Sequence, residues 1–382
     1  MTVAGLDGIV VAETVLSEVD GEAGRLVVRG LPVEALAGHA AFEEVARRLW
    51  EGLAPPPAPT TAAVWAALGR GRVAAFRNVE ELRRTAAGQP PVSALRLGLA
   101  SLRPGGAGDH LLATAAVPVF AAAFERARRG LPAVPPDPAL GHAADFLRML
   151  RGEPASAAEA AALDAYLVTV AEHGMNASTF TARVVASTRA GVLPAVIAAL
   201  CALEGPLHGG APGPVLEMLD ALRGQADVAG WLAAELAAGR RLMGFGHRIY
   251  RVRDPRADVL KAQVAKLRAA AERGPGPAAA GGRLALAERV EREALAALRD
   301  LRPGKRIDTN VEFYTAVLLD ALRIDRGLFT SVFAAGRVAG WTAHVFEQER
   351  ANRLIRPQSA YVGPRPEAEQ HPAGTVEALS QA

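Results

Sequence analysis

The chain has 382 residues, half of them hydrophobic, which allows a large core and predicts two domains. Lysine and arginine number 43 against 40 acidic residues, and no long run of like charges occurs, so a nucleic-acid-binding tail is not expected. The single cysteine, Cys201, excludes an internal disulfide and a cysteine-based zinc site, and its apolar neighbours predict a buried side chain.

The N-terminal sequence has no basic stretch followed by an apolar core, so a signal peptide is not expected. A membrane span is not expected either, because charge or proline interrupts every apolar stretch before it reaches about 18 residues. These features predict a soluble, cytoplasmic protein. Alanine and leucine dominate the apolar residues, and both favour helices, so the composition predicts an all-α protein.

Taken in chain order, one short region favours strands and almost everything after Pro32 favours helices. Residues 9–12 (IVVA) and 25–29 (RLVVR) are rich in β-branched and apolar residues and flank Asp20-Gly21, which predicts a small N-terminal β-hairpin. Helical spacing between glycine and proline breaks then predicts helices over residues 42–50, 60–68, 79–87, 91–102, 109–128, 139–150, 155–171, 192–203, 215–223, 226–238, 255–273, 285–301, 311–322 and 328–350. Residues 192–203 are apolar enough to be buried on all sides. Residues 274–282 read as a flexible loop, and 364–382 as extended chain.

Three of the eight histidines stand in glycine-bearing loops, where a ligand can approach the backbone closely. They are His173 in AEHGMNASTF, His208 in GPLHGGAPG and His247 in GFGHRIY. A metal site is disfavoured, since no HxxxH or HExxH spacing occurs, and no G-x-S-x-G elbow or phosphate-binding loop is present. The remaining histidines have no such setting: surface positions are expected for His39, His110 and His371, and structural roles within helices for His142 and His344.

Three arginines also have unusual surroundings. Arg256 follows Asp254-Pro255 at a turn entering a helix, Arg337 stands in the apolar segment AAGRVAGW, and Arg356 precedes a proline in a basic loop. A buried arginine needs an anionic partner, so an internal salt bridge is the simplest interpretation of each. Together, however, the three could hold a dicarboxylate through bidentate hydrogen bonds.

These residues lie in segments that resemble the citrate synthase family. They are GPLHGGA, GFGHRIYRVRDPRA, NVEFYTAVLLDALRI and GRVAGWTAHVFEQ…RLIRP, in that order, and GLDGIVVAETVLSEVDGEAGRLVVRG and EHGMNASTF also resemble that family. The similarity extends over nearly the whole chain and is weakest over residues 55–135. It implies an all-helical homodimer with a large domain of residues 1–209 and 311–382. A smaller, mobile domain of residues 210–310 would close over the substrates.

The resemblance also implies a reaction and its residues. Members condense acetyl-CoA with oxaloacetate, in a Claisen-type step followed by thioester hydrolysis, to give citrate and CoA in the tricarboxylic acid cycle. No metal or bound redox cofactor is required. By position, Glu312 matches the base, His208 the donor to the enol, and His247 the residue that polarises the ketone and protonates the alkoxide. The oxaloacetate-binding set would be His173, Arg256, Arg337 and, from the other subunit, Arg356; Gly244, Phe245, Gly246 and Arg251 fall where coenzyme A lies.

Two positions depart from the family pattern: Glu312 stands where the family usually has aspartate, and Gln358 stands in RPQ where RPR is common, at an expected subunit or coenzyme contact. Glutamate keeps the carboxylate, with an unperturbed pKa only about 0.4 units higher. Its side chain is longer by one methylene, so the backbone must be placed differently to suit it. Two alternatives therefore stay open: a 2-methylcitrate synthase that uses propionyl-CoA, and a weakly active relative that binds acyl-CoA or oxaloacetate as a sensor or assembly partner.

Overall fold

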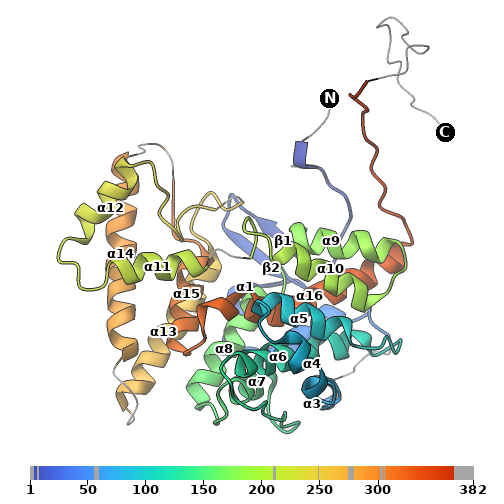
Figure 1. Ribbon diagram of the computed structural model, residues 1–382. Coiled ribbons are helices and arrows are strands. Elements are labelled where there is room, and N and C mark those ends of the chain that lie inside the picture. Colours follow the sequence, from blue (N-terminus) through green and yellow to red (C-terminus); the bar gives the residue numbers. More distant parts are fainter. Residues whose placement is uncertain are drawn as a thin grey trace, which may run out of the picture. The chain divides into compact units, whose positions relative to one another are not determined.

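The computed structural model describes residues 4–6, 8–55, 60–209, 212–247, 249–273, 279–301, 304 and 306–364. They fall into two units: Thr14–Leu354, and the terminal segments Met1–Glu13 and Ile355–Ala382. The larger unit is helical, as the composition predicts (Figure 1). Its helices are α1 (Val33–Leu36), α2 (Phe42–Trp50), α3 (Thr61–Phe76), α4 (Val79–Ala86), α5 (Pro91–Ala100), α6 (Asp109–Arg128), α7 (His142–Arg151), α8 (Ala157–Val170), α9 (Ala177–Ser187), α10 (Val192–Leu203), α11 (Pro212–Ala221), α12 (Val228–Ala237), α13 (Pro255–Arg273), α14 (Ala279–Leu301), α15 (Val311–Ala321), the 3-10 turn η2 (Arg326–Leu328) and α16 (Phe329–Ala351).

A small antiparallel sheet lies at the start of this unit, in the order β1 (Ser17–Asp20), β2 (Arg25–Val28) and β3 (Leu31–Pro32). The predicted hairpin is confirmed for its second strand, which is β2. The prediction of its first strand is wrong, because residues 9–12 form no strand and β1 pairs with β2 instead. Asp20 pairs with Arg25 across a short turn, so the nearer segment closes the smaller loop. The side chain of Val10 is 85% exposed and gains no burial that could favour pairing.

Every predicted helix overlaps an observed one, and the differences have local causes. Helix α3 continues beyond the predicted end at residue 68, through Gly69 and Gly71. A Cβ on Gly71 would lie 2.7 Å from the Ala115 Cβ, so this glycine lets α3 approach α6 closely and does not end the helix. Helix α9 was not predicted, since its β-branched residues lower helix propensity, but the Asn176 side chain caps it by accepting from the Thr179 N–H (3.1 Å).

The structure describes only part of the predicted flexible loop, residues 274–282, and of the predicted extended tail, residues 364–382. Residues 279–282 belong to α14, which begins earlier than expected. Residues 274–278 and 365–382 lie outside the described residues. In the terminal unit, η1 (Ala4–Leu6) is the regular element among the described residues, and the apolar side chains of Val10 and Val362 are exposed.

Three burial predictions are wrong: those for Cys201, for His110 and for residues 192–203, which are not buried on all sides because Pro194 and Cys201 are exposed. Cys201 is exposed, with its Sγ 3.7 Å from the Arg96 Nη1, because α10 buries only one side against its neighbours. His110 is 1% exposed and lies edge-on to the rings of Trp50 and Phe346. His142 and His344 are completely buried within their helices, as their structural interpretation predicts. His39 is exposed as expected, and His371 lies outside the described residues.

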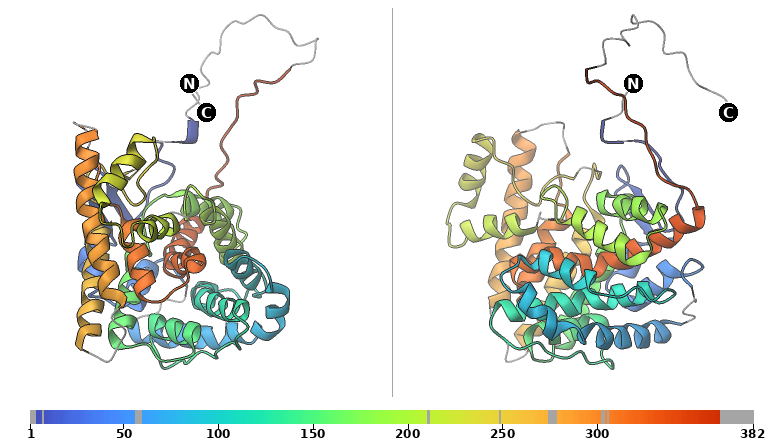
Figure 2. Two further views of the ribbon diagram at one scale, coloured as in Figure 1. Left: turned by 60° about the vertical axis from the view of Figure 1, so that its left-hand side comes forward. Right: turned by 45° about the vertical axis from the view of Figure 1, so that its right-hand side comes forward.

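Helices α16 and α15 carry predicted site residues and pack against most of the neighbouring helices. Helix α16 packs against α6, α8, α9 and α10, and its middle is buried over Ser331–Val345 apart from the partly exposed Phe333. Helix α15 packs mainly against α13 and α11, and the long α13 and α14 run side by side (Figure 2). Across the described helices, none is both long and apolar enough to cross a membrane. The division into domains of residues 1–209 with 311–382 and 210–310 stays a prediction.

Candidate active site

Four loop or helix-start segments carry the predicted site residues. His173 lies between α8 and α9, His208 after α10, His247 before α13, and Glu312 in the first turn of α15. The start of α15 is capped by Asn310, whose Oδ1 accepts from the Glu312 N–H at 3.0 Å. The Asn310 Nδ2 donates to the Gly246 carbonyl at 2.7 Å. One asparagine therefore joins the turn that bears Glu312 to the loop that bears His247.

His173 and His247 lie together around Tyr250. The His173 Nε2 is 3.1 Å from the Tyr250 hydroxyl, and the centroids of the two imidazole rings are 6.0 Å apart. The His247 Nδ1 accepts from the backbone N–H groups of Ile249 (3.0 Å) and Tyr250 (3.1 Å). Its proton must therefore be on Nε2 when the ring is neutral. Burial, then the Arg256 charge, lowers the pKa of His247 to about 4, so this ring is a neutral donor near pH 7.

The orientation of His208 is set by a hydroxyl on α9. The His208 Nε2 is 2.8 Å from the Ser178 Oγ, which accepts from the Trp341 Nε1 at 3.1 Å and donates to the Asn176 Oδ1 at 2.8 Å. Burial, then the charge of Arg337, lowers the pKa of His208 to about 4. With Nε2 occupied by Ser178, the Nδ1 edge is the one that can face a substrate.

Arg256 has an internal partner. Its Nε and Nη2 donate to the two carboxylate oxygens of Asp254, at 3.0 and 2.8 Å. Asp254 Oδ2 also accepts from the Val311 N–H at 3.2 Å, which joins the starts of α13 and α15. Burial opposes the charge of Arg256, but Asp254 outweighs it and raises the pKa of Arg256. The internal salt bridge that the sequence suggests for Arg256 is therefore present, formed with Asp254, and the Arg256 Nη1 takes no part in it.

Arg337 has no such carboxylate among the described residues. Its Nε donates to the Val170 carbonyl at 2.5 Å, and its guanidinium lies 4.7 Å from the Phe333 ring centroid. The residue is 2% exposed, and burial lowers its pKa to about 10. A buried cation whose terminal N–H groups have no anionic partner is suited to an anionic ligand.

Glu312 is partly buried, and no described residue forms a hydrogen bond to its carboxylate. Burial raises its pKa to about 7, although Arg256 acts in the opposite direction. The charge of Arg337 also lowers that pKa, so Glu312 lies within electrostatic reach of both arginines. Such a carboxylate can accept a proton near neutral pH.

The sequence segment GFG has a structural role near Glu312. Gly244 has a positive φ of 87°, and a Cβ there would lie 2.8 Å from the Phe313 side chain. The ring of Phe245 packs against that of Phe313 at 5.3 Å. Arg251 is exposed and pairs with Glu22 at 3.7 Å. The contact of Gly244, Phe245, Gly246 and Arg251 with coenzyme A stays a prediction.

Arg356 is an exposed residue of the terminal unit, and its reach into the site of another subunit also stays a prediction. The structure thus groups His173, His247 and Arg256 around Tyr250. Electrostatic interactions tie Arg337 to His173, His208, Arg256 and Glu312.

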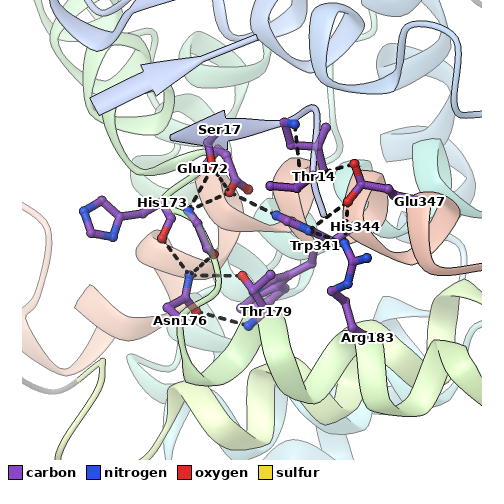
Figure 3. Close-up of polar contacts among 12 residues, drawn as sticks. Thr14, Ser17, Glu172, His173, Asn176, Thr179, Arg183, Trp341, His344 and Glu347 are labelled. Atoms are coloured by element: carbon purple, nitrogen blue, oxygen red, sulfur yellow. Dashed lines mark hydrogen bonds and ion pairs between the residues drawn. The ribbon is translucent and has the colours of Figure 1, made fainter. Parts of the chain in front are cut away.

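A buried polar network holds the loop of His173 in place (Figure 3). The Glu172 Oε1 accepts from the Ser17 hydroxyl (2.8 Å), the Gly174 N–H (2.8 Å) and the His344 Nε2 (3.0 Å). The Arg183 Nη1 donates to the His344 Nδ1 at 2.9 Å, which leaves the His344 proton on Nε2. Figure 3 shows the His173 ring pointing away from this network.

Sequence reasoning missed four residues that orient the site: Ser178, Tyr250, Asp254 and Asn310. All four lie inside or beside the segments already singled out, so the signal available was proximity to a motif. Their partners come from distant parts of the chain, and sequence spacing does not reveal these. Among the described residues, no cluster of three or more histidine, cysteine or acidic side chains could hold a metal ion.

Comparison with known proteins agrees with this geometry. The family described as "Citrate synthase, C-terminal domain" matches residues 5–358. The chain belongs to the citrate synthase family. It is 37% identical over 380 residues to the citrate synthase of Haloferax volcanii, covering 94% of this chain and 95% of that protein. It is 35% identical over 376 residues to the 2-methylcitrate synthase of Mycobacterium tuberculosis, covering 94% and 90%.

Solved structures support the same family and fold. The crystal structure of citrate synthase from Thermotoga maritima matches with a TM-score of 0.80 at 33% identity, over 95% of this chain and 96% of that one. The all-α architecture with a small N-terminal sheet is thereby confirmed, and the family supports an enzyme that condenses an acyl-CoA with oxaloacetate.

Proposed function

We propose that this protein condenses acetyl-CoA with oxaloacetate to give citrate and CoA. The observation that carries the proposal is the pairing of one available carboxylate with two neutral imidazole donors. Glu312 has a pKa raised to about 7, whereas His208 and His247 have theirs lowered to about 4. A thioester methyl is a weak carbon acid, so its deprotonation needs a base and a donor to the developing enolate oxygen.

In this proposal, Glu312 removes a proton from the acyl methyl group while His208 donates to the thioester oxygen. For Nδ1 of His208 to carry that proton, the Ser178 hydroxyl must donate to Nε2. The Ser178 hydroxyl proton, which is donated to the Asn176 Oδ1 at 2.8 Å, must therefore turn to Nε2 in the reacting complex, while the Trp341 Nε1 keeps donating to the Ser178 Oγ. The nucleophilic carbon then attacks the ketone of oxaloacetate, forming a carbon–carbon bond.

The ketone oxygen becomes an alkoxide, which His247 stabilises and protonates through Nε2–H. Arg337 and Arg256, with His173, would bind the two carboxylates of oxaloacetate. Water then adds to the thioester carbonyl, and the carbon–sulfur bond breaks to release CoA as a thiol. The protein's groups suffice for these proton transfers, and we propose no metal or bound redox cofactor.

The direct test is release of CoA thiol when acetyl-CoA and oxaloacetate are supplied together. Release is expected only with both substrates, and Arg337→Met should abolish release at ordinary oxaloacetate concentrations, because the variant loses a proposed oxaloacetate-binding residue. A wild-type protein that stays silent across several pH values would overturn the proposal.

A second candidate is 2-methylcitrate synthase activity, because a relative with that name is nearly as similar to this chain. One extra methyl in an apolar pocket changes binding by only about 1–3 kcal/mol. The ratio of kcat/KM for acetyl-CoA and propionyl-CoA decides between the two activities.

The third possibility is a weakly active relative that acts as a sensor, and Glu312 motivates it. We expect Glu312→Asp to lower turnover, because aspartate is shorter by one methylene and would hold the carboxylate farther from the acyl methyl group. A large rise in turnover would instead indicate a site damaged by glutamate.

We also propose that the protein is a homodimer in which each site receives Arg356 from the other subunit. The proposal rests on the family resemblance and on the exposure of Arg356 in its own chain.

A further inference from the structure

A second buried carboxylate, away from the groups assigned to the reaction, receives four donors. Glu291 lies on α14, and its side chain is 8% exposed. Its Oε1 accepts from the Thr309 hydroxyl at 2.8 Å and from the Arg253 Nη1 at 2.9 Å. Its Oε2 accepts from the Tyr314 hydroxyl at 2.6 Å and from the Lys261 Nζ at 2.9 Å. One side chain therefore binds groups on α13, on α15 and on the loop before each of these helices.

Three of those donors lie close in sequence to proposed catalytic residues. Tyr314 is on the same helical turn as Glu312, and residues two apart on a helix point to opposite sides. Tyr314 thus binds Glu291 on one side of the first turn of α15, and Glu312 lies on the opposite side of the same turn. Thr309 lies just before that turn, and Arg253 lies on the loop that begins at His247.

We propose that Glu291 is a positioning residue that fixes the first turn of α15 against residues 249–254, the segment just before α13. It thereby sets where the Glu312 carboxylate stands relative to the His247 Nε2–H. This inference rests on the proposed function, because it assigns Glu291 a role in placing the base and the donor of that reaction.

The chemistry of the cluster suits this role. Hydrogen bonds to a charged group are shorter and stronger than neutral ones, and here they converge from several segments on one carboxylate. Burial alone would raise the pKa of Glu291, but hydrogen bonds from Tyr314, Lys261 and Thr309 outweigh it and hold that pKa at about 2. Glu291 therefore stays ionised while Glu312 titrates near pH 7.

The lysine adds a second link to the same turn. The Lys261 Nζ also lies 5.4 Å from the Tyr314 ring centroid, within range of a cation–π interaction. The aromatic ring of Tyr314 is completely buried, so Tyr314→Phe removes one hydroxyl and leaves the packing in place.

The test measures kcat and oxaloacetate binding for Tyr314→Phe and Glu291→Gln. A shift of about 1 Å in a reacting group can cost about a hundredfold in rate, so we expect Tyr314→Phe to lower kcat at least about tenfold. Its Kd for oxaloacetate should stay within about twofold of the wild-type value, since the substitution removes no contact of Arg337, His173 or Arg256, which is held by Asp254. Glu291→Gln, which loosens both the α15 turn and residues 249–254, should lower kcat further.

A double-mutant cycle separates positioning from general loss of structure. If Tyr314 acts through Glu312, Tyr314→Phe should change the residual single-turnover rate of Glu312→Gln by less than about twofold. An undiminished tenfold loss in that background would overturn the inference.

The matched control is Asp145→Asn on α7. Asp145 is also a buried carboxylate with several donors: the Arg72 Nε at 2.7 Å, the Arg148 Nη2 at 2.8 Å and the Asp137 N–H at 3.1 Å. None of these donors adjoins a proposed site residue, so Asp145→Asn should lower the melting temperature and leave kcat within about twofold.

The two proposals fail separately. An active wild-type enzyme whose Tyr314→Phe and Glu291→Gln variants keep full kcat would overturn the role of Glu291 and leave the proposed function standing. A wild-type protein that releases no CoA would overturn both.

Discussion

At the scale of single residues, the site depends on how burial separates the protonation behaviour of its groups. Burial disfavours charge, so it raises the pKa of the carboxyl group of Glu312 and lowers those of the imidazoles of His208 and His247. The same physical cause thus yields a base and two neutral donors. The sequence supplies the residue types, and burial shifts the pKa values of the carboxyl group and of the imidazoles in opposite directions.

The first prediction concerns the pH dependence set by Glu312. We expect kcat/KM to fall as the pH drops below about 7, because the base must be ionised, and the neutral histidines should add no break above about pH 4. Glu312→Gln should lower kcat by about 10²–10⁴-fold and remove that acid limb. An acid limb that persists in Glu312→Gln would show that another group is the base.

The same substitution has a consequence for stability. The folded-state pKa of Glu312, about 7, lies above its ordinary value of 4.5, so ionisation in the folded protein is disfavoured. This penalty is absent below about pH 4.5, grows as the pH rises and is complete above about 7. Glu312→Gln should therefore raise the melting temperature more at about pH 8 than at about pH 5, as measured by thermal unfolding.

The second prediction concerns Ser178, which orients His208. Ser178→Ala removes the hydroxyl that contacts the His208 Nε2, so the ring loses the contact that, in the proposed reaction, keeps its proton on Nδ1. We expect kcat to fall about tenfold or more, with oxaloacetate affinity little changed by calorimetry. The control is Thr181→Ala on the same helix, whose exposed hydroxyl only donates to the Ala177 carbonyl. Equal effects of the two substitutions would contradict the assignment.

At the scale of elements, the starts of helices place the groups that we propose to react. The Asn310 cap ends one loop and begins α15, and its amide also holds Gly246 of the neighbouring loop. Helix α9 likewise begins at a capping asparagine, directly after the loop of His173. Capping motifs of this kind are short in sequence and fix the entry angle of the chain.

The third prediction compares two caps. Asn310→Ala should lower the free energy of unfolding by about 1 kcal/mol and also lower kcat, because Glu312 and the Gly246 loop lose their common anchor. Asp227→Ala removes the cap of α12, where the side chain accepts from the Gly230 N–H at 2.8 Å. It should cost a similar free energy, measured by denaturant unfolding, without affecting kcat. A fall in kcat for both variants would show that the loss is only one of stability.

At the scale of the whole molecule, the proposed dimer completes the site. If Arg356 acts across the interface, two inactive variants should complement each other. In a hybrid dimer of His208→Ala and Arg356→Ala chains, one site keeps His208 and receives an intact Arg356 from its partner.

The fourth prediction is the outcome of that mixing. Co-expressed His208→Ala and Arg356→Ala chains should recover about a quarter of the wild-type activity, because half of the dimers are hybrids with one intact site. Each variant alone should be nearly inactive. No recovery on mixing, with hybrids verified by mass, would place the action of Arg356 within its own chain.

The sequence by itself determined the helical class, the positions of most helices and the family. Helix periodicity and breaks are local, so they can be read without knowing what packs against what. The same is true of motifs such as GPLHGGA and NVEFY, which carry His208 and Glu312 as contiguous residues. The misplaced first strand and the buried His110 mark the limit, since pairing and burial depend on distant partners.

Only the tertiary structure decided which residues orient the site. The Ser178 hydroxyl reaches His208 from thirty residues away, Asp254 binds the start of α15, and Glu291 gathers donors from α13, α15 and their preceding loops. Such contacts form because buried polar groups must find partners wherever the fold brings them, whatever their sequence separation. The pKa values that distinguish Glu312 from the histidines arise in the same way, from burial that no local pattern records.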